Sequence, residues 1–482
     1  MADPVQVLPC DIISVILLFL LSPHPGIEEY DALFNCSLVN WAFNQEASKL
    51  LYLHITFHRS LSSSFNLRDN GLLEGKTAWN SALLPQYAPF VRHLKINGVM
   101  SERHPPKNQF PEALLNAVKS FVNLSSVTFT TKGGYIETFT EPLRLLPELS
   151  SLDAVNVGGD WLDEKRAHLL TELKRLRKVS IISPSRAMLD LLPGWLKELK
   201  DDLMELHLLN DCGSITPGVL STIIRSLHNI RSFSMGLSFS ITDHDLFNAI
   251  SQLSCLEDLG VYYYYQQMIP WDGPSVPSLR FLTVTIKDHP FSAQMFESLS
   301  KWIQRIIYPR TLPRPRVESL RISEDNCFYA RNDIFKFDSL VYHLAAKHAN
   351  SLRVLDMPTM FISVRALKVL FEQCGELEEL SFSSGKNLLT QFREQAHSLT
   401  KLHTVGLYVR HAKWRDISID EVESMYASVP SLRSLAINGE KWDGFWTSSE
   451  VDGGKFTFQI KPRKKRPFAY AVITTNNTQI FL

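Results

Sequence analysis

The sequence lacks an excess of charge of either sign, since its 482 residues include 50 basic and 50 acidic side chains. A chain without net charge has no general attraction to nucleic acid or to an anionic membrane surface. It also lacks a long hydrophobic run: the most apolar stretch, Ile12 to Leu21, is about half of the ~20 residues that span a bilayer. The start Met-Ala-Asp-Pro has no basic segment of the kind that opens a secretory signal. We therefore expect an intracellular protein, cytoplasmic or nuclear, that binds neither nucleic acid nor membrane.

Cysteine is scarce, and the sequence has no C-x-x-C pair; the six cysteines are Cys10, Cys36, Cys212, Cys255, Cys327 and Cys374. This spacing favours free thiols in a reducing compartment over a disulfide framework or a zinc site. The sequence also contains no H-E-x-x-H, no G-x-S-x-G, no Walker loop and no G-x-G-x-x-G after a strand. We expect no metal, no cofactor and no catalysis by this chain, although a triad assembled from distant residues would leave no local motif.

A short phrase recurs through most of the chain: two apolar residues flank one exposed residue, usually with a leucine three residues upstream. It occurs thirteen times between Leu94 and Ile437. In the clearest run the anchor residues lie 27, 27, 27 and 26 residues apart: Leu152, Val179, Leu206, Phe233 and Leu259. Self-similarity at a fixed period of this length indicates a stacked-repeat architecture, which typically offers a binding surface for other proteins.

The residues between the phrases have the period of a helix. After Cys212 come Thr216 and Pro217, a suitable N-cap and first helical residue, and then apolar residues at Leu220, Ile223, Ile224 and Leu227. Each unit is therefore predicted to form a strand, a turn and a helix in about 25 residues, so that the strands of neighbouring units pair in parallel. Gaps of 38 and 35 residues between Leu282, Leu320 and Leu355 indicate insertions.

These units resemble leucine-rich repeats, and the order of Cys, Ile-Thr, helix and Cys-x-x-Leu is similar to the cysteine-containing subclass. The resemblance implies an α/β fold, a leucine-rich-repeat solenoid (horseshoe) of about 13 units over residues 89–440. A helical linker or N-terminal cap is expected over 58–88 and a C-terminal cap or tail over 441–482.

Residues 4–57 differ from the repeats and are predicted to form two or three short helices. The strings Leu8-Pro9-Cys10-Asp11-Ile12-Ile13 and Cys36-Ser37-Leu38-Val39-Asn40 resemble an F-box, most closely those that precede leucine-rich repeats in fungal proteins. Two residues depart from the family pattern: Phe43 replaces a usual tryptophan, and Trp41 stands where a basic residue is typical. The resemblance implies docking on the Skp-type adaptor of a cullin–RING ubiquitin ligase, through residues that correspond by position to Leu8, Pro9, Ile12, Ile13, Leu38 and Val39. The alternative is a module that only caps the open end of the solenoid.

The target of such a protein is expected to lie on the concave face of the repeats, formed by residues beside the strand leucines. That face is mostly small and neutral. Its aromatic and arginine residues are the side chains enriched at binding hot spots, and they suggest Tyr262, Tyr264, Trp271, Phe281, Arg321 and Tyr408 as target-binding residues. Alternatively, the rings of Tyr262 to Tyr265 alternate between the core and an insertion.

The tail contains two β-prone segments, Lys455 to Ile460 and Phe468 to Ile473, which are predicted to pair as a closing hairpin. The basic run 461–467 between them is either the tip of this hairpin or a nuclear-import signal.

Three functional hypotheses follow. In the first, the protein is the substrate-recognition adaptor of an SCF-type (Skp–cullin–F-box) ubiquitin ligase and binds an unknown target protein. The second is a leucine-rich-repeat scaffold or regulatory interaction protein without a ligase role. The third is an enzyme whose site lies within the insertions.

Overall fold

The computed structural model describes residues 8–20, 27–57, 81–99, 110–132, 136–264, 276, 278–287, 293–307, 316–324, 336–385, 387–409, 417–448, 456–462, 472–475 and 478–481. The chain divides into two compact units. The first comprises Met1–Val261 and Met268–Pro274, and the second comprises Tyr262–Gln267 and Ser275–Leu482. In the described ranges no helix is both long and apolar enough to cross a membrane.

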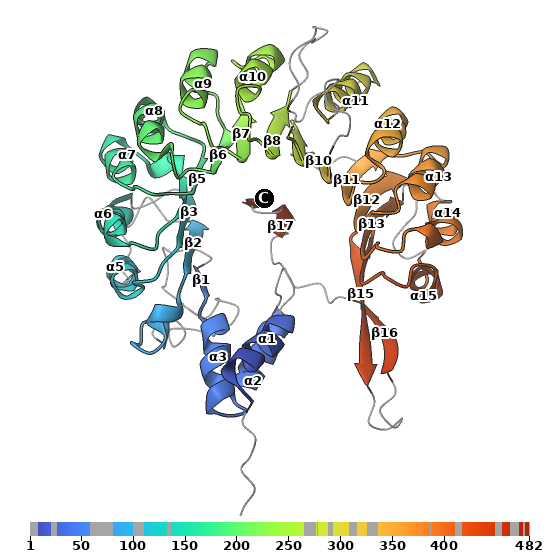
Figure 1. Cartoon of the computed structure of the whole chain (residues 1–482), viewed down its shortest axis with the longest axis horizontal. Helices are drawn as coiled ribbons and strands as arrows, with labels where there is room; N and C mark the ends of the chain where they lie inside the picture. The colour runs from blue at the N-terminus through green and yellow to red at the C-terminus, as the bar shows by residue number, and fades with distance from the viewer. Residues whose placement is uncertain are drawn as a thin grey trace, which may run out of the picture. The chain divides into compact units, whose positions relative to one another are not determined.

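Parallel strands in sequence order form the sheet of the first unit (Figure 1). They are β1 (His54–Phe57), β2 (His93–Val99), β3 (Ser126–Lys132), β4 (Ala154–Gly158), β5 (Lys178–Ile182), β6 (Glu205–Asp211), β7 (Ser232–Leu237) and β8 (Asp258–Tyr263). The last two residues of β8 fall in the second unit. The register is regular, because the apolar anchors stand opposite one another: Leu94, Val127, Val155, Val179, Leu206, Phe233 and Leu259. All seven are buried, and a buried side chain of this size contributes roughly 1.5–3 kcal/mol. This continuous apolar ladder confirms the predicted repeat.

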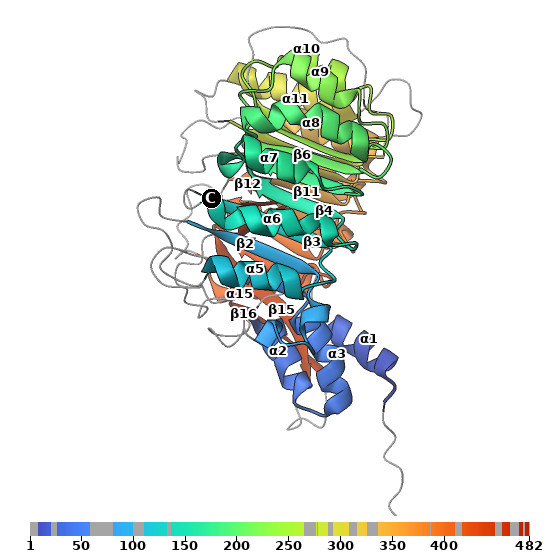
Figure 2. The ribbon, with the colours of Figure 1, turned by 90° about the vertical axis from the view of Figure 1, so that its left-hand side faces the viewer.

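Helices cover one face of this sheet, and Figure 2 shows α5 to α8 side by side across it. They are α5 (Phe110–Ser120), α6 (Thr140–Leu145), α7 (Glu164–Thr171), α8 (Arg186–Leu199), α9 (Pro217–Ile224) and α10 (Asp243–Ile250). The predicted N-cap is confirmed, since Thr216 Oγ1 accepts a hydrogen bond from the Val219 N–H with Pro217 at the first helical position. The opposite side of the strands carries no described helix, and we call it the helix-free face.

Three helices precede the sheet: α1 (Cys10–Phe19), α2 (Ile27–Ser37) and α3 (Trp41–Leu51). The sequence predicted helix beyond Leu51, but His54–Phe57 instead form β1 and pair with β2. The rings of Tyr52 and Tyr87 stack at 4.5 Å, and Tyr52 Oη donates to Ser81 Oγ. The α1–α3 module is therefore joined to the repeats by a shared sheet and by the stacking of the buried Tyr52 ring on the half-buried Tyr87 ring.

The second unit repeats the same strand, turn and helix order. Its parallel strands are β9 (Phe281–Ile286), β10 (Ser319–Glu324), β11 (Val354–Phe361), β12 (Glu379–Ser384), β13 (Thr404–Val409) and β14 (Ser434–Ile437). Its helices are α11 (Ala293–Ile307), α12 (Asp338–His348), α13 (Val364–Gln373), α14 (Leu388–Gln395) and α15 (Ile419–Ser428). Both units are thus α/β leucine-rich-repeat solenoids.

The predicted pairing of the tail was wrong for its described residues; residues 468–471 of the second predicted segment lie outside them. β16 (Phe456–Pro462) pairs with β15 (Glu440–Ser448), whereas β17 (Val472–Thr475) pairs with β18 (Thr478–Phe481). A tight turn at Asn438 and Gly439, both with positive φ, folds β15 back antiparallel to β14, so that β15 offers its other edge to β16. Pro462 and Lys461 lie at the end of β16, and the rest of the basic run 461–467 is outside the described residues.

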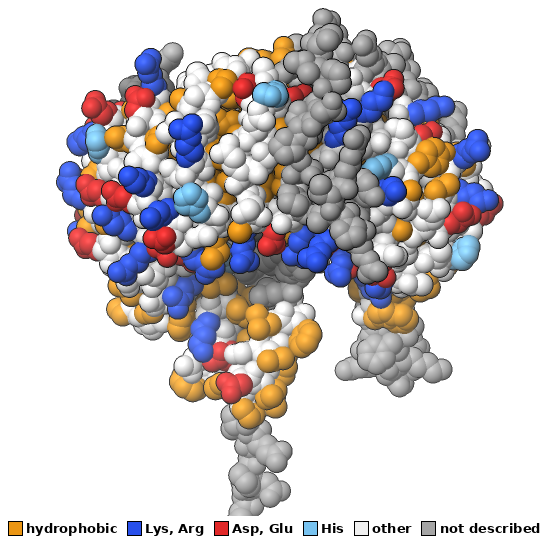
Figure 3. All heavy atoms as spheres, turned by 45° about the horizontal axis from the view of Figure 1, so that its top comes forward, with side chains coloured by type: hydrophobic (Ala, Val, Ile, Leu, Met, Phe, Trp, Pro, Cys, Tyr) orange, Lys and Arg blue, Asp and Glu red, His pale blue; other side chains and the backbone are white. Residues whose placement is uncertain are grey.

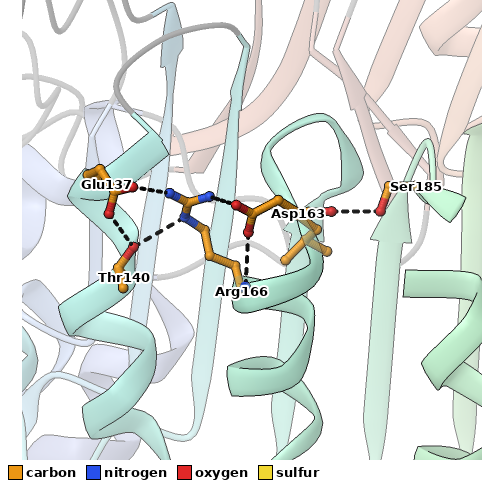
Figure 4. A network of polar contacts seen from close by, with 6 residues as sticks. Glu137, Thr140, Asp163, Arg166 and Ser185 are labelled. Carbon is orange, nitrogen blue, oxygen red and sulfur yellow. Dashed lines mark hydrogen bonds and ion pairs between the residues drawn. The ribbon is translucent and has the colours of Figure 1, made fainter. Parts of the chain in front are cut away.

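A buried arginine ties two neighbouring helices of the first unit together (Figure 4). Arg166 of α7 is 2% exposed. Its guanidinium binds Asp163 (2.7 Å), Glu137 (2.9 Å) and the Thr140 hydroxyl (3.2 Å), the last at the start of α6. Both carboxylates are more than half exposed. The charge that burial penalises is therefore that of the arginine alone.

Because Arg166 is buried and its two carboxylate partners are exposed, removing the arginine should destabilise the protein less than neutralising the carboxylates. Replacing Arg166→Met removes the bonds but also the buried charge, so we expect a loss of only about 1 kcal/mol. The double variant Glu137→Gln, Asp163→Asn leaves the buried guanidinium uncompensated and is expected to cost about 2–3 kcal/mol. Urea denaturation of the three proteins would measure the order, and a greater loss for Arg166→Met would contradict it.

Candidate functional site

The outer surface of α1 is the most apolar exposed feature of the described chain. Helix α1 buries a narrow stripe, Ile13 and Leu17, against the rest of its module. Eleven of the nineteen large apolar side chains that are exposed in the described ranges lie between Leu8 and Trp41. Hydrophobic side chains gather on this N-terminal lobe in Figure 3. A helix that is apolar on two faces is expected to be covered on both.

Three of the exposed apolar residues of α1 follow the period of a helix. Ile12, Val15 and Phe19 are spaced i, i+3 and i+7, which places them on one face, and the exposed Leu8 directly precedes the N-cap of the helix, Pro9. Phe19 is 86% exposed. We call these four residues the α1 outer stripe.

A second group of exposed apolar side chains lies at the turn between α2 and α3: Phe34, Leu38, Val39 and Trp41. Local hydrogen bonds hold this turn. Asn40 Oδ1 accepts from the Phe43 N–H (3.0 Å), and Asn44 Nδ2 donates to the Ser37 carbonyl (3.0 Å). The backbone is thus fixed by its N-cap, while Trp41 remains 76% exposed.

A buried carboxylate anchors α1 to α3. Glu46 accepts hydrogen bonds from Ser14 Oγ of α1 and from Lys49 Nζ, each at 2.6 Å. Burial acts to raise the pKa of Glu46, but the bonds from Lys49 and Ser14 outweigh it, and the pKa is lowered from its ordinary value. The ionised side chain therefore helps to hold α1 with its outer stripe turned away from the module.

The six residues predicted to bind an adaptor have different surroundings. Leu8, Pro9, Ile12, Leu38 and Val39 are exposed, whereas Ile13 is 1% exposed and belongs to the core of the module. The sequence analysis missed Val15, Phe19 and Phe34. The i, i+3, i+7 spacing from Ile12 was a signal that would have found the first two.

Five of the six residues predicted to bind a target lie in the second unit, between the end of β8 and β13. Tyr263 is buried against Trp302, so the rings do alternate into the core, while Tyr262 and Tyr264 are partly exposed. Phe281 lies under the Arg280 guanidinium (5.1 Å), and Tyr408 is half exposed. Trp271 is outside the described residues.

Arg321 already has two partners on the helix-free face. Its guanidinium binds Asp356 of β11 and Glu379 of β12, both at 3.0 Å, and the side chain is 13% exposed. A buried arginine with both carboxylates satisfied is a structural ion pair first. It is therefore less available to a target than the sequence suggested.

The helix-free face of the first unit carries a polar row that the sequence analysis did not single out. Glu205 accepts from Lys178 Nζ (2.7 Å) and His207 Nε2 (3.3 Å), and His207 Nδ1 lies 3.0 Å from Ser234 Oγ. Next to it, Ser232 Oγ donates to Asp258 (2.8 Å). Parallel register brings these residues together from β5 to β8, at a separation of 26 or 27 residues between repeats.

The ionisation of Glu205 predicts a pH dependence of stability. The hydrogen bond from His207 lowers its pKa; burial opposes this and Lys178 adds to it, so that the pKa falls from 4.5 to about 2. A lowered carboxyl pKa stabilises the fold above the unfolded value, and this contribution disappears as pH falls from about 4.5 towards 2. Glu205→Gln should therefore destabilise the protein at pH 7 and progressively less below pH 4.5.

Urea midpoints of both proteins at pH 7, 5 and 3.5 would measure this difference. Glu112→Gln, at an exposed position of α5, provides the control. A difference between native and Glu205→Gln protein that stays constant across this range would contradict the prediction.

Ser234, His207 and Glu205 are linked side chain to side chain, as in a hydrolytic triad, but the row lacks an oxyanion hole. The backbone N–H groups beside Ser234 belong to a strand paired on both sides, β7 between β6 and β8. They are committed to the sheet and do not form an oxyanion hole. The row fits binding better than acyl transfer.

Comparison with known proteins identifies no family. No family model matches the chain, and no curated protein matches it. Among solved structures, it is similar to the Rad7 and Elc1 complex in yeast, with 14% identity, a TM-score of 0.43, and coverage of 69% of this chain and 83% of that chain. The leucine-rich repeat-containing protein LegL7 from Legionella pneumophila matches with 11% identity and a TM-score of 0.29, over 78% of this chain and 100% of that one. The TLR13–ssRNA13 complex matches with 13% identity and a TM-score of 0.25, over 73% and 43%. These identities and TM-scores are too low to assign a fold or a function. The strand order and register of the chain itself define the fold.

Proposed function

We propose that this protein is the substrate-recognition adaptor of an SCF-type ubiquitin ligase. In this proposal α1 to α3 dock on a Skp-type adaptor, and through it on a cullin–RING ligase, while the repeats hold a target protein. The observation that carries the proposal is the α1 outer stripe. It is an apolar helix face with no cover among the described residues, in a segment whose sequence resembles an F-box.

The energetics favour a partner over a bare cap. A cap of a solenoid needs a polar outer face, whereas the α1 outer stripe and the α2–α3 turn expose Phe19, Leu38, Val39 and Trp41. Burial of such side chains in an interface contributes about 25 cal/mol per Å² before the cost of association. Two apolar groups held on a fixed module thus supply a surface suited to a stable complex.

The repeats would act without catalysis. Their helix-free face carries polar rows held in place by the sheet, which suits recognition, and transfer of ubiquitin would be the task of the ligase. Free thiols agree with a reducing compartment, cytoplasmic or nuclear: Cys212 and Cys374 are buried, and burial raises the pKa of each to about 12.

The test is co-expression with a Skp-type adaptor followed by size-exclusion chromatography, with native protein and a Leu8→Ala, Pro9→Ala double variant. Co-elution of the native chain that the variant loses would support the ligase role. A native chain that is folded and monodisperse but does not bind would favour the alternative, a repeat scaffold that α1 to α3 only cap.

A further inference from the structure

The helix-free face of β6 to β8 presents hydrogen-bond acceptors. The Glu205 carboxylate is ionised and only accepts: Lys178 Nζ and His207 Nε2 donate to it, and its remaining lone pairs are free of other described donors. The Ser234 hydroxyl lies 3.0 Å from His207 Nδ1, and whichever of the two groups donates, the hydroxyl keeps at least one lone pair that can accept. Ser232 donates to Asp258. We call Glu205, Ser234 and Asp258 the acceptor row.

Asp258 is the member of the acceptor row with the least compensated charge. Lys178, the cation that pairs with Glu205, comes from β5, three strands away, and forms no ion pair with Asp258. Among the described residues no basic side chain forms an ion pair with Asp258, which is half-buried. Burial raises the pKa of this carboxyl and the Glu205 charge adds to the rise, while the hydrogen bond from Ser232 and the electrostatic effects of His207 and Lys178 oppose it without cancelling it.

The backbone beside Asp258 is bare on the same face. Gly260 follows two residues later on β8, and a Cβ at that position would lie 2.6 Å from Ser234 Oγ. No side chain therefore separates the Ser234 hydroxyl from the carboxylate on this strand, which leaves the acceptor row open to a donor from outside.

The second unit shows what such a row accommodates. There Ser381 and Gly406 have the same relation, because a Cβ on Gly406 would also lie 2.6 Å from the serine Oγ. Beside that pair, the helix-free face holds a guanidinium: Arg321 spans β10 to β12 and bridges Asp356 and Glu379. In the first unit, the register places Ser180, His207 and Ser232 at the positions of Arg321, Asp356 and Glu379. The carboxylates of that unit lie instead at Glu205 and Asp258, on either side of Ser232, and among the described residues no arginine pairs with them.

We propose that the acceptor row of the first unit binds a basic side chain of the target protein, preferably arginine, with Asp258 as its ion-pair partner. A guanidinium supplies five donors in a plane, which matches a set of acceptors on neighbouring strands, and its charge compensates Asp258. This inference deepens the proposed function, since it names the chemistry by which the repeats recognise a target.

The experiment is selection from a random peptide library displayed on phage, against the native protein and against Asp258→Asn. Asparagine keeps the size of the side chain and an acceptor for Ser232. Peptides selected by the native protein are expected to be enriched in arginine or lysine, and the best of them should bind Asp258→Asn about tenfold or more weakly. Asp202→Asn, at an exposed position after α8, should bind them as the native protein does.

A double-mutant cycle locates the contact. Replacing the essential arginine of the selected peptide with citrulline, which is isosteric and uncharged, should weaken binding to the native protein but have little further effect on Asp258→Asn. Peptides without basic enrichment, equal binding to Asp258→Asn, or failure to select any peptide would overturn the inference. Adaptor docking is measured separately through α1, so its failure together with binding of basic peptides would refute the ligase role and leave this surface in place.

Discussion

The double variant Ile12→Asp, Phe19→Asp is expected to lose co-elution with a Skp-type adaptor, and its affinity for the adaptor should fall more than about 100-fold. Both side chains are exposed on the α1 outer stripe, so the substitutions do not disturb the core of the module. In the complex, by contrast, two apolar contacts are lost and two carboxylates lie against an apolar partner. The cost of removing these two carboxylates from water lowers the affinity further.

Two controls make this result interpretable. Val122→Asp introduces the same change at a residue of the repeats that is 55% exposed, and should leave adaptor binding unchanged. Circular dichroism should show native helix content in every variant. If the Ile12, Phe19 variant still co-elutes with the adaptor, the α1 outer stripe is not the docking surface.

Gly236→Ala is expected to destabilise the first unit by more than about 3 kcal/mol. Gly236 lies on β7 beneath Asn210 of β6, where a Cβ would lie 2.1 Å from the Asn210 carbonyl oxygen and 2.7 Å from its nitrogen. Both are backbone atoms that a rotamer change does not move. Asn210 itself has φ of +59°, and the β6–β7 register shifts between Leu208 and Asp211, so the backbone is already bent at this point.

The measurement is thermal unfolding followed by circular dichroism, and the midpoint should fall by about 6 °C or more. Gly194→Ala is the matched control, since Gly194 lies within α8 and a Cβ there would meet nothing within 4 Å. This second substitution should stabilise the protein by roughly 0.5–1 kcal/mol. Equal midpoints for the two variants would contradict the steric argument.

The sequence predicted the class of fold because the repeat imposes the same burial pattern many times over. Anchors such as Val179, Leu206 and Phe233 are each ambiguous alone, but their spacing allows one pairing, in which all are buried together. The closing hairpin was predicted wrongly although the dipeptide Asn438-Gly439 is a strong hairpin signal. The same two residues also fit the end of a repeat, so the pattern did not distinguish a hairpin turn from the end of a strand.

The sites were less predictable than the fold. The F-box-like string located the module and five exposed residues of the candidate face. It did not show that Ile12 is exposed and Ile13 is buried, with 48% and 1% of their surfaces accessible, respectively. Which side of a short apolar helix is buried depends on the orientation of its neighbours, here α3 with Glu46 bound to Ser14.

By itself, the sequence determined the repeat period, the strand, turn and helix order, the helix caps and the apolar ladder of this protein. These depend on local propensity and on a pattern that recurs every 26 or 27 residues in the regular repeats. Only the tertiary structure decided which polar residues meet on the helix-free face. Arg321 binds carboxylates 35 and 58 residues away, whereas Asp258 is left without such a cation among the described residues. The physical reason is that irregular insertions set these separations, and side chains on neighbouring strands become partners only through the register of the sheet.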